Sequence, residues 1–116
     1  MMHALTLRLA QLAAGGQTIT YGQLARDLGL TGPATIARLT AALETTMEED
    51  AAQNHPFRAV VLSGRLAKDL PAQGFFDKAA ELSRYQGQDA AEYIAAERAA
   101  LMSFIRAQIS HGGAGV

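Results

Sequence analysis

The stretch ITYGQLARDLGL, from Ile19 to Leu30, predicts a short helix with a defined start and a defined end. Thr18 or Thr20 can cap its first turn by accepting a backbone N–H, and Gly29 can adopt the positive φ with which many helices end. The side chains that we expect this helix to bury are Leu24, Ala25 and Leu28.

The segments on either side extend this helix into a helix-turn-helix. Upstream, leucines recur at helical spacing until Gly15 and Gly16, where we expect that helix to end. Downstream, a turn over residues 30–33 leads into a helix that we expect over residues 33–52, with Pro33 in its first position. The apolar stripe expected along this third helix is Ile36, Leu39, Leu43 and Met47.

The pattern then changes from helix to strand and back to helix. Residues 58–62, RAVVL, have the β-branched content of a strand, Ser63 and Gly64 indicate a turn, and the following residues would return as a second strand or a loop. Two more helices are expected, one starting at Phe75 and one over residues 89–109. We therefore predict one domain over residues 1–110, mostly α with a small β-hairpin: a winged helix-turn-helix with additional C-terminal helices, followed by a mobile tail over residues 111–116.

Composition limits the functions to be considered. The 116 residues carry 10 basic and 11 acidic side chains, so nucleic-acid binding would depend on local clusters rather than on net charge. The chain has no cysteine, and His3, His55 and His111 lack the spacing of metal ligands. We expect no enzymatic activity, metal or cofactor. Without a visible signal peptide or membrane segment, we expect a cytoplasmic protein that does not interact with membranes.

The first group of candidate binding residues belongs to the helix-turn-helix. In such units the N-terminal residues of the second helix face the major groove. Here these residues are Thr31, Thr35 and Arg38. Arg38 can bind guanine or phosphate, and Arg26 is placed to hold a phosphate. The hydroxyl of Tyr21 is a further candidate for phosphate, the alternative being a buried ring whose hydroxyl reaches the surface.

The second group of candidates surrounds the expected hairpin. Arg58, Arg65 and Lys68 are three positive charges in a segment without a negative one, as a wing lying along phosphates requires. The alternative is an ordinary charged hairpin whose charges protect its edge from aggregation.

The stretch GQTITYGQLARDLGL resembles the start of the winged-helix, DNA-binding domain of alkylguanine-DNA alkyltransferases and alkyltransferase-like proteins. The family's Pro-Cys-His-Arg-Val strand aligns with residues 56–60, PFRAV, so its nucleophilic cysteine falls at Phe57 and the activating histidine at Arg58. Alkyl transfer is therefore chemically impossible here. The alkyltransferase-like branch also lacks this cysteine, and its base-flipping arginine falls near Ala37, one place from Arg38. The rear half, up to Phe76, is similar to small winged-helix modules of bacterial and phage proteins.

Three functions remain open on this sequence. The first is a non-enzymatic winged-helix protein that binds double-stranded DNA, as a small bacterial or phage regulator would. The second is a protein-interaction module that binds a partner or a second copy through its C-terminal helices or through the acidic run of residues 44–50. The third, implied by the resemblance alone, is recognition of modified bases without chemistry.

Overall fold

The computed structural model describes residues 1–64 and 69–114, with side chains described up to Ser110. This part of the chain is mostly helical, as predicted, and contains a small two-stranded sheet. The elements in chain order are α1 (Met2–Ala14), β1 (Ile19–Thr20), α2 (Tyr21–Asp27), α3 (Thr35–Ala52), the 3-10 helix η1 (Arg58–Val61), β2 (Leu62–Ser63), α4 (Gln73–Glu81) and α5 (Ala90–Ala114).

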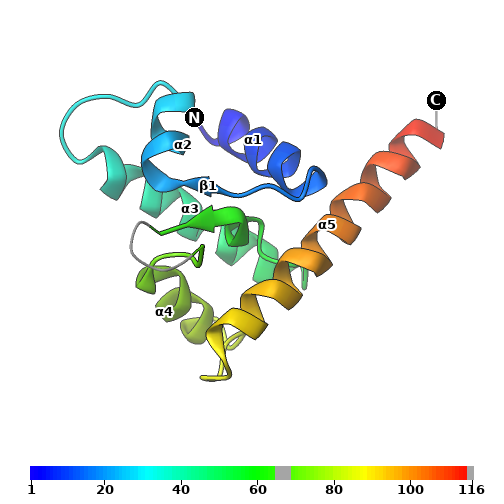
Figure 1. The fold of residues 1–116 in the computed structure, drawn as a ribbon. Coiled ribbons are helices and arrows are strands. Elements are labelled where there is room, and N and C mark those ends of the chain that lie inside the picture. The colour runs from blue at the N-terminus through cyan, green and yellow to red at the C-terminus, as the bar shows by residue number, and fades with distance from the viewer. Residues whose placement is uncertain (65–68, 115–116) are drawn as a thin grey trace.

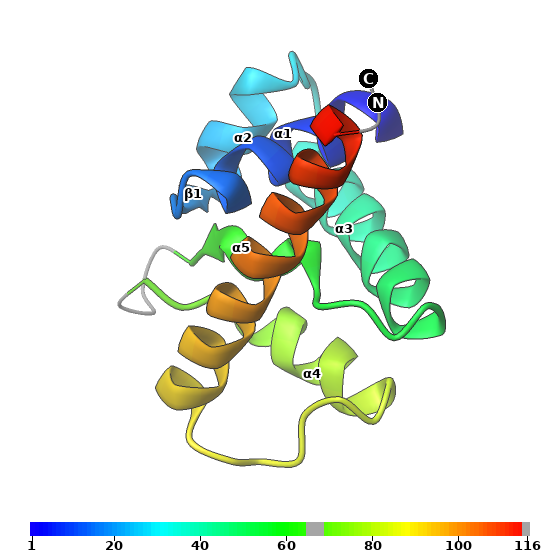
Figure 2. The same cartoon turned by 90° about the vertical axis from the view of Figure 1, so that its right-hand side faces the viewer.

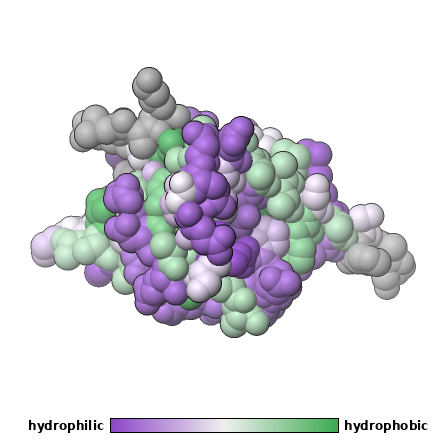
Figure 3. All heavy atoms as spheres, turned by 90° about the horizontal axis from the view of Figure 1, so that it is seen from below, coloured by the Kyte–Doolittle hydropathy of each residue, from purple (hydrophilic) through white to green (hydrophobic). Residues whose placement is uncertain are grey.

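The η1–β2 segment lies in the middle of the fold, and the helices pack around it (Figure 1). Phe57, Val60 and Leu62 are all fully buried there. Helix α5 crosses the molecule from the side of α4 to the end of α1, and its C-terminal turns project beyond the body (Figures 1 and 2). The face on the α4 side carries a hydrophilic band between more apolar regions (Figure 3).

The start and end signals of the first helices are confirmed. The hydroxyl of Thr20 caps α2 by accepting a hydrogen bond from the backbone N–H of Gln23 at 3.2 Å. Gly16 and Gly29 follow α1 and α2 with φ of +66° and +70°. The expected first position of α3 is wrong by two residues, because Ala34 adopts a left-handed conformation with φ of 60° and the helix starts after it.

The expected apolar stripes are mostly confirmed, with two exceptions. Leu5, Leu9 and Leu12 of α1 are buried, as are Leu24 and Ala25 of α2 and Leu39, Leu43 and Met47 of α3. Leu28 is only half-buried, and 47% of the surface of Ile36 is exposed. Ile36 lies in the first turn of α3, one turn before the buried Leu39.

The predicted β-hairpin is wrong in the residues that the structure describes. Residues 58–61 form η1 instead of a strand, and the two-residue strand β2 pairs in parallel with β1, with Ile19 opposite Leu62 and Thr20 opposite Ser63. The expected tip of the wing, residues 65–68, lies outside the described residues, so the wing itself stays a prediction. Beyond this tip, the carbonyl of Leu70 accepts a hydrogen bond from the backbone N–H of Gly64.

Arg98 of α5 explains why this segment is not an ordinary strand. Its Nε–H donates to the carbonyl of Val60 at 2.8 Å, and Nη2 donates to the carbonyl of Leu62 at 3.1 Å. The carbonyl of Val60, in η1, therefore has a side-chain donor in place of a neighbouring strand, and the carbonyl of Leu62 has one beside the pairing of β2 with β1. Burial lowers the pKa of Arg98, and the nearby carboxylate of Asp69 opposes this shift.

Replacing Arg98 with methionine is expected to destabilise the fold by about 2 kcal/mol, because two buried carbonyls lose a charged donor. Urea denaturation measures this change. Arg106→Met is the matched control, because the exposed Arg106 donates to a single carbonyl, that of Ala14, near the end of α5. Equal loss in the two variants would contradict the special role of Arg98.

A second cluster joins α5 to the chain before η1. Glu97 accepts the backbone N–H of Phe57 at 2.8 Å and a guanidinium N–H of Arg84 at 3.2 Å. The guanidinium also lies 4.4 Å from the centre of the Phe57 ring. Beside them, the buried hydroxyl of Tyr93 has no hydrogen-bond partner among the described residues. Burial, together with the negative charge of Glu97, raises the pKa of Tyr93 to about 12.

Tyr93 is expected to make the fold lose stability at high pH. The folded state holds the phenol proton up to a pKa of about 12, whereas the unfolded chain releases it near 10.0. The stabilisation is therefore complete below the lower value and is lost as the pH rises through this window. Urea denaturation along a pH series should show a steeper fall for the wild type than for Tyr93→Phe. Parallel curves would contradict this assignment.

Candidate nucleic-acid interface

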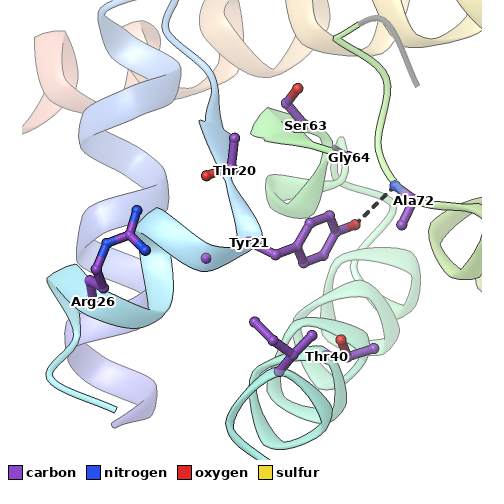
Figure 4. A pocket seen from close by; sticks show the side chains of 9 residues that line it. Thr20, Tyr21, Arg26, Thr40, Ser63, Gly64 and Ala72 are labelled. Atoms are coloured by element: carbon purple, nitrogen blue, oxygen red, sulfur yellow. Dashed lines mark hydrogen bonds between the residues drawn. The ribbon is translucent and has the colours of Figure 1, made fainter. Parts of the chain in front are cut away.

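A cleft of about 600 Å³ opens between α2, the first half of α3 and the chain around β2 (Figure 4). We call it the α2–α3 cleft. Four separate segments of the chain form its walls, and the parallel pairing of β1 with β2 brings two of them, around Thr20 and Ser63, side by side. The lining residues are Thr20, Tyr21, Gly22, Arg26, Ile36, Thr40, Ser63, Gly64 and Ala72.

Tyr21 stands at the inner end of this cleft. Its half-buried ring crosses toward the chain before α4, and its hydroxyl accepts the backbone N–H of Ala72 at 3.2 Å (Figure 4). Burial raises the pKa of Tyr21, and the hydrogen bond from Ala72 only partly opposes this. The phenol is therefore neutral at physiological pH, and its own proton remains available as a donor to a ligand.

Arg26 lies at the outer side of the same cleft and is exposed. Its Nη2 donates to the side-chain carbonyl of Gln23 at 2.9 Å, one turn earlier in α2. No carboxylate of residues 1–64 or 69–110 forms an ion pair with it. The neutral side chain of Gln23 thus orients the guanidinium, and no described carboxylate neutralises its positive charge.

The turn between α2 and α3 brings the other three helix-turn-helix candidates together. Arg38 folds back over the turn, and its Nη2 donates to the carbonyl of Thr31 at 3.1 Å. The hydroxyl of Thr35 donates to the carbonyl of Gly32 at 2.6 Å. Arg38 is exposed and, like Arg26, forms no ion pair with a described residue.

The structure places Arg58 away from this surface. Its Nε lies 2.9 Å from the carboxylate of Asp50, and its Nη2 lies 3.1 Å from that of Glu49, at the C-terminal end of α3. Its charge is therefore neutralised within the fold and is not available beside the cleft. Arg65 and Lys68, the other two candidates of the expected hairpin, lie outside the described residues.

Most other basic residues that the structure describes also have carboxylate partners. Arg8 pairs with Asp27, and the remaining pairs are Lys78 with Glu48 and Glu81, Arg84 with Glu97, and Arg98 with Asp69. Against this background, Arg26, Arg38 and Arg106 have no carboxylate partner among the described residues, and the first two lie on α2 and in the first half of α3.

Beneath the α2–α3 cleft lies a smaller pocket of about 50 Å³. The two share Tyr21, Thr40 and Ala72, so the pocket continues the cleft inward. Its other lining residues are largely apolar side chains from α3, η1 and α4: Leu43, Glu44, Met47, Ala59, Gly74 and Phe75.

Sequence reasoning missed several residues of this site. Thr40, Ser63, Gly64 and Ala72 carried no signal, because only the tertiary fold brings them to one cleft. Ile36 was assigned to the core, since its spacing matches the buried stripe of α3. The sequence pattern does not reveal that this residue is exposed and lines a cleft instead of packing in the core.

The chain was compared with protein-family models, with curated proteins and with solved structures. No match was found in any of the three. In the described part of the chain, no group of three or more histidine, aspartate or glutamate side chains is placed to hold a metal ion. None of the described helices combines the length and the apolar character of a membrane-spanning segment.

Proposed function

We propose that this protein binds double-stranded DNA without enzymatic chemistry, through α2, the α2–α3 turn and the start of α3. The observation that carries the proposal is the pair of exposed arginines, Arg26 and Arg38, that have no carboxylate partner among the described residues. Phosphates attract such charges, and release of the counterions around DNA adds to the affinity.

The arrangement of α2 and α3 supports entry of α3 into the major groove. A short helix, a connection over residues 28–34 and a longer helix with exposed N-terminal residues follow one another in the order found in helix-turn-helix proteins, although this connection is longer than their turn of about 3–4 residues. The hydroxyls of Thr31 and Thr35 contact phosphate or base edges in this proposal. In this proposal the protein is a small DNA-binding regulator, and Arg65 and Lys68 would add phosphate contacts from the wing.

Fluorescence anisotropy with a labelled mixed-sequence duplex tests this proposal. If Arg26 and Arg38 each neutralise one phosphate, affinity should fall about tenfold between 50 and 200 mM salt, and more if the wing contributes. No binding at low salt would contradict DNA binding. Binding that does not depend on salt would contradict the role of the two arginines.

A second candidate function is recognition of a modified base without chemistry. The observation that favours it is the apolar pocket that continues the α2–α3 cleft beneath Tyr21. A base turned out of the duplex would lie in the α2–α3 cleft of about 600 Å³, with this pocket beneath it as an apolar floor, because the pocket of about 50 Å³ is too small for a base. Duplexes that differ only in one O6-methylguanine test this function. Tighter binding of the modified duplex supports it, and equal affinity contradicts it.

Binding of a protein partner or a second copy through the C-terminal helices also stays a prediction. The projecting end of α5 is the relevant surface, and Ile109 is 61% exposed there, two turns after the buried Leu101 (Figure 1). Light scattering tests the homodimer, because a strict monomer at high concentration would contradict it.

A further inference from the structure

We infer that Ile36 contacts the 5-methyl group of thymine in the major groove. The inference rests on the proposed DNA binding and names a residue that would give it sequence preference. It starts from the position of a large apolar side chain that the fold leaves exposed on α3.

Ile36 differs from the other exposed large apolar residues in its surroundings. Met1, Leu7 and Ile109 are more than half exposed, and none of them lines the α2–α3 cleft or the pocket beneath it. Ile36, at 47% exposure, lines the α2–α3 cleft on the second residue of α3. A β-branched side chain on a helix has one strongly preferred χ1 rotamer, so little conformational freedom would be lost when it makes contact.

The neighbours of Ile36 indicate what it would contact. Thr40 lies one turn further along the same face of α3, and Arg26 lines the same cleft from α2. An apolar surface, a hydroxyl and an unpaired guanidinium therefore lie together. In the major groove, thymine presents a methyl group beside its O4 acceptor, with the phosphates at the edge of the groove. Of the four bases, only thymine offers an apolar group there.

The contribution of this contact to the affinity follows from the apolar area that it buries. Covering a methyl group and the opposing part of an isoleucine contributes roughly as much as burying one to two CH₂ groups, which corresponds to about a four- to fifteenfold change in affinity. This is smaller than the effect of phosphate contacts on overall affinity. It would act as a preference among sequences that are already bound.

The test compares two duplexes of the same A·T-rich sequence, one with thymine and one with deoxyuridine at every thymine position. Deoxyuridine differs only in lacking the methyl group. We expect the wild type to prefer the thymine duplex by about fourfold or more, and Ile36→Ala to bind both duplexes equally. Leu7→Ala is the matched control, because Leu7 is 52% exposed on α1 and should leave the preference unchanged.

Two results would overturn the inference while leaving DNA binding intact. The wild type could bind both duplexes equally, or Ile36→Ala could keep the full preference for thymine. Absence of binding to either duplex at low salt would overturn the proposed function and this inference together. The three results are distinguished in a single set of titrations.

Discussion

Replacing Asp50 with alanine is expected to lower the free energy of unfolding by about 3 kcal/mol. Asp50 is only 3% exposed, at the last turns of α3, and accepts both the backbone N–H and the Nε–H of Arg58 at 2.9 Å. Burial raises the pKa of its carboxyl, and the contacts with Arg58 oppose this shift. Without the carboxylate, a partly buried guanidinium and a backbone N–H lose their principal acceptor.

Urea denaturation measures this loss, and Glu49→Ala provides the matched control. Glu49 contacts the same arginine at 3.1 Å, but its side chain is 49% exposed. An exposed ion pair of this kind contributes less than about 1 kcal/mol. Similar losses of free energy of unfolding in the two variants would contradict the prediction that the buried carboxylate contributes more to stability than the exposed one.

Replacing both Arg26 and Arg38 with alanine is expected to reduce affinity for duplex DNA at every sequence tested. Each arginine that neutralises one phosphate contributes about 0.9 to the slope of log affinity against log salt, so the slope should become less steep by about 1.8. Neither side chain is in an ion pair with a described residue, so their removal should cost the fold little. Anisotropy titrations over a salt series measure both effects.

Two further variants make this prediction specific. The double lysine variant keeps both charges and should keep the slope, since Lys also neutralises phosphate. Arg106→Ala removes the same charge from α5, where Arg106 donates to the carbonyl of Ala14, and should leave the slope unchanged. An unaltered slope in the double alanine variant would show that the two arginines do not contact phosphate.

The helices could be predicted from the sequence because their signals are local. The leucine spacing of α1, the Thr20 cap and Gly29 act within a few residues, and the structure agrees with each of them. The sheet could not be predicted in this way. Residues 58–62 have the composition of a strand, but most of them form η1, and their carbonyls bind Arg98, a residue 36 positions after Leu62.

The residues of the candidate site, too, could be predicted only where they belong to a local sequence pattern. The sequence indicated Tyr21 and Arg26, which line the cleft, because they belong to the helix-turn-helix pattern itself. It also grouped Arg58 with the wing on the basis of charge. Sequence spacing carries no information about which carboxylates a folded chain brings near an arginine, and here Asp50 and Glu49 neutralise it.

The proposed binding of duplex DNA by α2 and the start of α3 can be tested directly. The most direct test is an NMR titration of ¹⁵N-labelled protein with a mixed-sequence duplex, at low and at moderate salt. We expect amide shifts concentrated over residues 21–38 that weaken as salt is added. The absence of shifts at low salt, or shifts confined to α5 and the acidic residues 44–50, would contradict the claim.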